Sequence, residues 1–171
     1  MQRVRAAANR AAARRGHPIR IAVRVPNSPE NAWYSGMDVA AWAHEGLIDV
    51  AVPSPYFGST CHTVPVWLWK QLLGKAVEVT PCLELHISMG RDDRVLTDLF
   101  ADTGFTASFY AQGADGIYLY NHFPGNGYIP QSPELFPYAS TILPYGEGRE
   151  TQREFFSIAG NYKELCRRER R

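Results

Sequence analysis

The chain lacks several features that mark specialised classes of protein. Its three cysteines, Cys61, Cys82 and Cys166, are far apart and form no CxxC pair, so neither a zinc knuckle nor a disulfide framework is indicated. We expect small buried or semi-buried thiols. No apolar run approaches the ~18 to 20 residues of a membrane span. The net charge of +1 over 171 residues gives no bulk electrostatic case for nucleic acid or an anionic membrane.

Familiar catalytic and cofactor motifs are also missing. The sequence contains no GxGxxG, P-loop, GxSxG or HExxH pattern. Nucleotide cofactors, serine hydrolysis and zincin chemistry therefore lack support, and we expect no cofactor and no metal. The histidines His62, His86 and His122 follow three different expected strands, and with Glu84 they could ligate a metal. Independent loop histidines are the favoured alternative, because no HxxxH spacing supports ligation.

Acidic residues are absent before Glu30, whereas five arginines lie within the first 17 residues. An arginine-rich, acid-poor start is typical of a transit peptide. The alternative, which we favour, is a surface helix over about residues 2–15 that ends at Gly16 and leads without a linker into a strand at Ile19. No targeting signal fixes the compartment, and the localisation is left open.

Four short apolar runs recur along the chain and predict an α/β fold. They begin at Ile19, Ile48, Val77 and Asp115, with helix-like stretches between them. This rhythm is typical of a parallel sheet, and we expect strands in sequential order near 19–25, 48–53, 77–82 and 115–121. Helices are expected near 2–15, 38–45, 65–73, 92–100, 105–112 and 151–168, and Asp38 is expected to be the N-cap of the second. A turn with capping residues is expected at 27–30, and loops over 56–64 and 124–137.

Polar or aromatic residues follow the apolar runs and define a candidate site, because chemistry gathers at the carboxyl ends of parallel strands. These residues are Arg24, Asn27, Ser54, Tyr56, Glu84, His86, Asn121 and His122. Sugars stack on aromatic rings, and this end of the sheet is expected to hold Tyr56, Tyr120 and Tyr128. Trp67 and Trp69 are expected to serve core packing.

Three segments resemble one family. DVAAWAHEGLIDVAVPSPYF (38–57) resembles the helix-to-strand-six passage of glycoside-hydrolase-like (β/α)8 barrels. GADGIYLYNHF (113–123) is similar to the final barrel strand of those proteins, and FFSIAGNYKELCRR (155–168) to their closing helix. The resemblance implies one half-barrel domain over residues 1–171, with an initial helix and four βα units corresponding to strands five to eight of a TIM-type barrel. The helices would lie on the outer face.

The resemblance also implies a function and its partners. The chain would be the C-terminal part of a glycoside hydrolase acting on a carbohydrate, a fragment of a larger barrel and inactive alone. Glu84 would be the surviving catalytic carboxylate, because the strand that carries its partner in the family is missing. Substrate binding would fall to Arg24, Tyr56, His86, Tyr120, Asn121, His122 and Tyr128. The open half-barrel would associate with itself or with the missing half.

Each of these assignments has an alternative. The chain could be a non-catalytic carbohydrate-binding or protein-interaction module on a degenerate barrel. Glu84 could be a solvated loop acid or accept a structural hydrogen bond, and Arg24 could form an internal ion pair with Glu84. Asp49 and Glu78, near the starts of their strands, are expected to be structural, with Asp49 anchoring a turn or an arginine.

Overall fold

The structure is a computed structural model of the whole chain, and it describes residues 1–55, 63–84, 86–88, 94–96, 99–120 and 149–167. The chain divides into two compact units. Unit 1 comprises Met1–Tyr56, Thr63–Cys82 and Phe109–Tyr118, and unit 2 comprises Phe57–His62, Leu83–Ser108 and Leu119–Arg171. The expected single domain over residues 1–171 stays a prediction.

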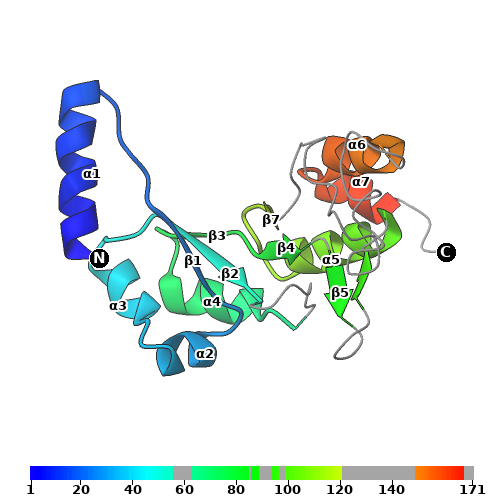
Figure 1. Cartoon of the computed structure of the whole chain (residues 1–171), viewed down its shortest axis with the longest axis horizontal. Coiled ribbons are helices and arrows are strands. Elements are labelled where there is room, and N and C mark those ends of the chain that lie inside the picture. Colours follow the sequence, from blue (N-terminus) through cyan, green and yellow to red (C-terminus); the bar gives the residue numbers. More distant parts are fainter. Residues whose placement is uncertain (56–62, 85, 89–93, 97–98, 121–148, 168–171) are drawn as a thin grey trace, which may run out of the picture. The chain divides into compact units, whose positions relative to one another are not determined.

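Unit 1 is built on a parallel sheet of three strands in sequential order (Figure 1). Strand β1 (Ala22–Pro26) pairs with β2 (Val50–Ser54), which pairs with β3 (Glu78–Val79). Ala22 lies opposite Val50, and Val50 lies opposite Glu78. The predicted parallel, sequential order is therefore confirmed for these three strands.

Four helices belong to unit 1: α1 (Gln2–Arg15), α2 (Pro29–Tyr34), α3 (Val39–His44) and α4 (Val66–Leu73). Gly16 ends α1 in the left-handed conformation, with φ 74°, as predicted. The Asp38 carboxylate accepts a hydrogen bond from the Ala41 N–H and caps α3, also as predicted. Helix α2 packs against β1, and α4 packs against β3.

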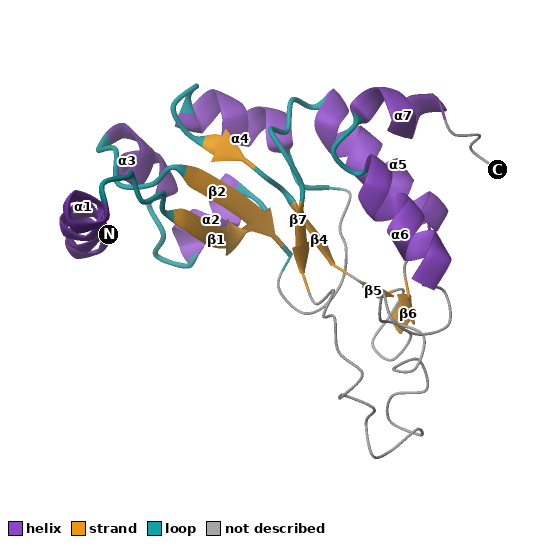
Figure 2. Ribbon diagram, turned by 90° about the horizontal axis from the view of Figure 1, so that it is seen from above, coloured by secondary structure: helices purple, strands orange, loops and turns teal. Residues whose placement is uncertain are grey.

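The fourth apolar run lies beside the third. Asp115 N–H donates to Val79 O (3.0 Å) and Tyr118 N–H donates to Pro81 O (3.0 Å), so the two segments run in the same direction. Strands β4 (Cys82–Glu84) and β7 (Tyr118–Tyr120) then form a two-stranded sheet (Figure 2). A Cβ atom built on Gly116 would lie 3.3 Å from Thr80 Cγ2, so a glycine permits this close approach.

The remaining elements lie wholly or mainly in unit 2 and differ from the expectation. Strands β5 (His86–Ser88) and β6 (Arg94–Leu96) pair antiparallel. Helix α5 (Leu99–Ala111) follows, and the chain continues after the undescribed residues in α6 (Arg149–Ile158) and α7 (Tyr162–Arg167). The small strands described form no closed barrel.

Several predictions of local structure were wrong. The helix expected over 92–100 is replaced by β6 and the first residues of α5, because pairing with β5 overrides helix propensity. Helix α5 is continuous where two helices were expected. The final helix is interrupted between Ile158 and Tyr162. The turn with capping residues at 27–30 is correct in part: Ser28 caps α2, but Pro29 and Glu30 already belong to the helix.

Two expectations of burial also failed. Trp69 is 1% exposed, as predicted for a core residue, but Trp67 is 57% exposed. Cys82 is buried, whereas Cys166 is exposed. Helical geometry explains the tryptophans, because residues two apart on one helix point in different directions.

Candidate functional site

The register of the parallel sheet separates a polar face from an apolar face. Paired residues of parallel strands share a face, and neighbours along a strand alternate. Arg24, Val52 and Ser54 therefore lie on one face. The other face carries Val25, Ala51 and Val79, which are each 0% exposed. The apolar face suits packing against helices, so polar chemistry is expected on the first face.

Arg24 and Ser54 meet toward the carboxyl end of this polar face. The Arg24 Nε–H donates to Ser54 Oγ (2.7 Å), and Nη2 donates to Pro55 O (3.4 Å). Ser54 itself is 0% exposed and donates to Pro55 O (3.2 Å). The guanidinium is thus oriented by a buried hydroxyl and a backbone carbonyl, so two of the predicted site residues are in direct contact.

Unit 2 contains the carboxylate singled out by the sequence. Glu84 is the last residue of β4 and is only 1% exposed. Tyr120 is the last residue of β7, the strand paired with β4, and is half-buried. Of the two alternatives for Glu84, the solvated loop acid is wrong, because the residue lies within a strand and is buried. The structural hydrogen bond stays a prediction.

Helix α5 adds polar side chains to the interior of unit 2. Asp102, Thr103 and Thr106 are 5%, 9% and 0% exposed. They lie at spacings of one, three and four residues, which places them along one side of the helix. Buried polar side chains on a helix that also buries Ala107 show that this unit does not have a purely apolar core. Sequence periodicity gave no sign of them, since threonine is common on exposed helix surfaces as well.

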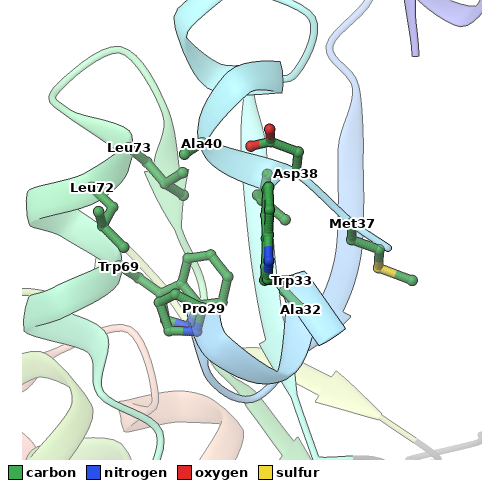
Figure 3. Close-up of a pocket in the computed structure, with 10 residues that line it drawn as sticks. Pro29, Ala32, Trp33, Met37, Asp38, Ala40, Trp69, Leu72 and Leu73 are labelled. Carbon is green, nitrogen blue, oxygen red and sulfur yellow. The ribbon is translucent and has the colours of Figure 1, made fainter. Parts of the chain in front are cut away.

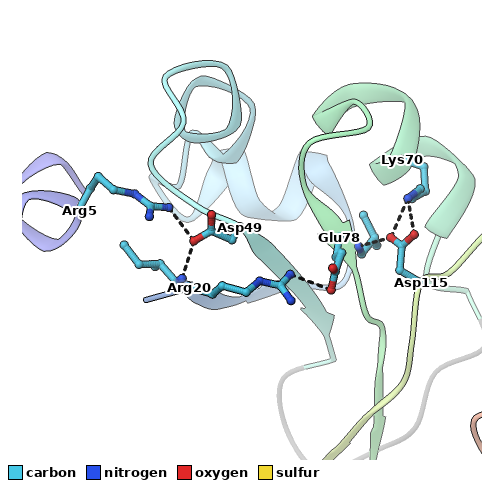
Figure 4. A network of polar contacts seen from close by, with 8 residues as sticks. Arg5, Arg20, Asp49, Lys70, Glu78 and Asp115 are labelled. Carbon is cyan, nitrogen blue, oxygen red and sulfur yellow. Dashed lines mark hydrogen bonds and ion pairs between the residues drawn. The ribbon is translucent and has the colours of Figure 1, made fainter. Parts of the chain in front are cut away.

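The amino ends of the strands hold a different set of charges (Figure 4). Asp49 Oδ2 accepts hydrogen bonds from the Ile21 N–H (2.6 Å) and from Arg5 Nη2 (2.7 Å). The Asp49 N–H in turn donates to Ile21 O (2.9 Å). The prediction that Asp49 anchors an arginine is confirmed. Glu78, also predicted to be structural, pairs with Arg20 at 2.8 Å.

Asp115 repeats the arrangement of Asp49. Its Oδ2 accepts from the Val79 N–H (2.7 Å) and pairs with Lys70 Nζ (2.6 Å), while its own N–H donates to Val79 O (3.0 Å). A glycine with positive φ precedes each aspartate: Gly46 at 67° and Gly113 at 95°. Each aspartate fastens the start of its own strand to the preceding strand. The sequence did not lead us to Asp115, although Gly-x-x-Asp before one strand and Gly-x-Asp before another was a usable signal.

Two residues of these ion pairs, Asp49 and Arg20, have shifted pKa values. Partial burial is the largest single influence on Asp49 and raises its pKa, but hydrogen bonds from Ile21 and Arg5, with the nearby charges of Arg5 and Arg20, hold the pKa below its ordinary value. The hydrogen bond and charge of Glu78 raise the pKa of Arg20. Burial raises the pKa of Tyr110. The charged forms of Asp49 and Arg20 are thus favoured, as expected for structural ion pairs.

A small cavity of about 160 Å³ lies among helices α2, α3 and α4 (Figure 3). Its walls are mostly apolar and include Trp33, Met37, Trp69 and Leu72, with Asp38 at one side. Trp33 lies at the surface and is 66% exposed. The indole Nε1–H of Trp69 donates a hydrogen bond to Asn27 O (3.0 Å) and is therefore not available to a ligand. Because Asp38 also caps α3, the cavity offers little polar chemistry to fix the orientation of a ligand.

The remaining predicted residues are placed only in part. Asn27 binds locally, with its side-chain oxygen accepting from Asn31 (2.9 Å). His86 begins β5, and its side chain is not described. Outside the described residues lie Tyr56, His62, Asn121, His122 and Tyr128, together with Cys61. The convergence of the whole predicted set stays a prediction.

Within the described ranges, no group of three or more histidine, cysteine, aspartate or glutamate side chains is arranged to hold a metal ion. The helices placed by the structure include none with the length and apolar character to cross a bilayer. No protein-family model matches the chain, and no curated protein matches it.

Proposed function

We propose that this chain supplies the counterparts of strands five to eight of a glycoside-hydrolase-like (β/α)8 barrel and takes part in binding a carbohydrate. The parallel order of β1, β2 and β3 supports the barrel, because consecutive βα units of a barrel pair in chain order. The Arg24–Ser54 contact supports the site, because barrel chemistry lies at the carboxyl ends of the strands.

Glu84 carries the proposal. Glu84 is 1% exposed and lies at the end of a strand, where the chemistry of parallel α/β proteins gathers. Glycoside hydrolysis uses carboxyl groups in such partly desolvated positions as acid, base or nucleophile. Tyr120, at the end of the paired strand, offers a ring on which a sugar can stack.

Hydrolysis requires a second carboxyl group on the opposite side of the glycosidic bond. In the proposed barrel that group comes from an earlier strand, outside these 171 residues. The chain alone therefore binds sugar weakly and turns it over poorly. In the proposed site, Glu84 accepts hydrogen bonds from hydroxyl groups of the sugar.

Two matched variants test this proposal. Glu84→Gln and Glu78→Gln make the same change at the carboxyl and amino ends of one extended segment. Calorimetric titration with neutral oligosaccharides should show binding that weakens about tenfold or more in Glu84→Gln, through loss of a charged acceptor, and is unchanged in Glu78→Gln. Equal effects of the two changes, or no binding by the unmodified chain, would overturn the proposal.

Aryl glycoside assays of the unmodified chain, Glu84→Gln and Glu78→Gln test whether the second catalytic carboxyl group is absent from this chain. We expect turnover close to background in all of them, because one member of the carboxyl pair is absent. Robust turnover that Glu84→Gln abolishes would show that both carboxyl groups lie in this chain. Sugar binding that persists without turnover when the missing strands are supplied in trans would identify a non-catalytic binding module.

A further inference from the structure

Helix α1 presents a row of arginines that the fold of unit 1 does not use. Arg3, Arg10 and Arg14 are separated by seven and four residues, which places them on one face of an α-helix. All three are exposed. None forms a hydrogen bond or ion pair within the described part of the chain. We call these three residues the arginine row.

The opposite face of α1 is the one that attaches to unit 1. Arg5, Ala8 and Ala12 are half-buried there, and no residue of the helix is fully buried. Two polar contacts fasten the first turns: Arg5 to Asp49 (2.7 Å) and Gln2 to Glu45 (3.3 Å). From these contacts the helix extends away from the sheet, as Figure 1 shows. The arginine row therefore lies on a fixed helix and faces away from the attachment.

The nearby acids leave the positive charge of the row uncompensated. Asp49 and Glu78 are paired with Arg5 and Arg20, and Glu45 accepts from Gln2. The sequence has no acidic residue before Glu30. Guanidinium groups bind carboxylates and sulfates through paired hydrogen bonds, so a surface of this kind suits a polymer with regularly repeated anionic groups.

We infer that the arginine row binds an anionic glycan, a polysaccharide carrying carboxylate or sulfate groups. This inference rests on the proposed carbohydrate function and extends it to the class of sugar. A lipid surface is less suitable, because the row is flanked by alanines rather than by the large apolar side chains that enter a bilayer. Single-stranded nucleic acid is less suitable because α1 offers no aromatic ring for base stacking.

Two triple variants of the full chain test the inference. Arg3→Gln/Arg10→Gln/Arg14→Gln removes the row, and Lys75→Gln/Arg153→Gln/Lys163→Gln removes the same charge from exposed positions elsewhere. The probes are a heparin oligosaccharide and a polygalacturonate oligosaccharide, titrated at about 50 and 200 mM salt because screening weakens such contacts. The row variant should bind at least one probe roughly tenfold more weakly, and the control within about twofold of the unmodified chain.

Three outcomes would overturn the inference: no binding of either probe by the unmodified chain, equal losses in the two variants, or tighter binding of duplex DNA than of both glycans. Arg3→Lys/Arg10→Lys/Arg14→Lys keeps the charge and should restore part of the affinity, which guards against a folding defect in the glutamine variant. Glu84→Gln separates the two proposals. If Glu84→Gln leaves all glycan binding intact while the row variant loses it, the arginine row is supported and the Glu84 site is rejected. If Glu84→Gln loses glycan binding while the row variant keeps it, only the arginine row is rejected.

Discussion

Among the described residues, unit 2 buries more polar side chains than unit 1. In unit 1, fully buried Val25, Ala51 and Val79 form an apolar layer, and the charged groups that pair lie at the amino ends of the strands. In unit 2, the interior includes Glu84 and Thr106, together with other polar side chains of α5. Buried polar groups add little to stability compared with apolar packing, so the polar groups buried in unit 2 invite a functional explanation.

The amino and carboxyl ends of the strands make the same contrast on a smaller scale. At the amino ends, Asp49 and Asp115 each bind a backbone N–H and a cation, which satisfies groups that the sheet itself leaves open. Toward the carboxyl ends, Arg24 donates hydrogen bonds to Ser54 Oγ and Pro55 O. We therefore expect changes at the amino ends to lower stability and changes at the carboxyl ends to lower ligand binding.

The largest expected effect comes from the apolar core of unit 1. Trp69→Ala should lower the free energy of unfolding by about 3 to 5 kcal/mol, through the cavity it leaves and the lost hydrogen bond to Asn27 O. Trp67→Ala is the matched control on the same helix and should cost less than about 1 kcal/mol, because Trp67 is 57% exposed. Urea denaturation measures both, and similar losses would contradict the assignment of Trp69 to the core.

The second-largest loss of stability is expected at Asp49 and Asp115, the aspartates at the starts of strands. Asp49→Ala and Asp115→Ala should each lower the free energy of unfolding by about 2 kcal/mol, because each leaves a backbone N–H and a partly buried cation without a charged acceptor. Exposed Glu30→Gln should change it by less than about 0.5 kcal/mol. Glu84→Gln sharpens the comparison: if it costs more stability than Asp49→Ala, then Glu84 is chiefly a structural residue.

The helix cap at Asp38 predicts a smaller loss. Asp38→Ala removes the acceptor of the Ala41 N–H (2.9 Å) and should cost about 1 kcal/mol. Asp38→Asn keeps an acceptor at the same position and should recover most of that loss. Thermal unfolding followed by circular dichroism measures both. Equal destabilisation by alanine and asparagine would show that the carboxylate acts through its charge rather than as a cap.

The smallest effect is a dependence on pH. Because the folded chain holds the pKa of Asp49 below its ordinary value of 3.8, ionised Asp49 contributes stability that is complete above that value. The contribution is lost as the pH falls from there through the lower folded pKa. The difference in unfolding free energy between the unmodified chain and Asp49→Asn should therefore be constant near neutrality and shrink below about pH 4. A difference that grows toward low pH would contradict the assigned direction.

The sequence was most informative where local chemistry and periodicity agree. It predicted the parallel order of the first three strands, the end of α1 at Gly16, the cap of α3 at Asp38 and the anchoring role of Asp49. It failed at β6, where residues with helix-compatible sequence pair with β5. It also missed the burial of Asp102 and Thr106, because exposure of a helix face depends on what the helix packs against.

The sequence by itself determined the βα rhythm, because apolar periodicity and glycine or proline boundaries act over a few residues. It also marked Glu84 and the arginines of α1 by type. Only the tertiary structure decided that Glu84 is buried, that Arg24 meets Ser54, and that Asp115 repeats the role of Asp49. The Arg24–Ser54 and Val79–Asp115 contacts join residues 30 and 36 positions apart in the chain. Contacts at that separation depend on which segments pack together, and a pattern over a few residues does not specify that.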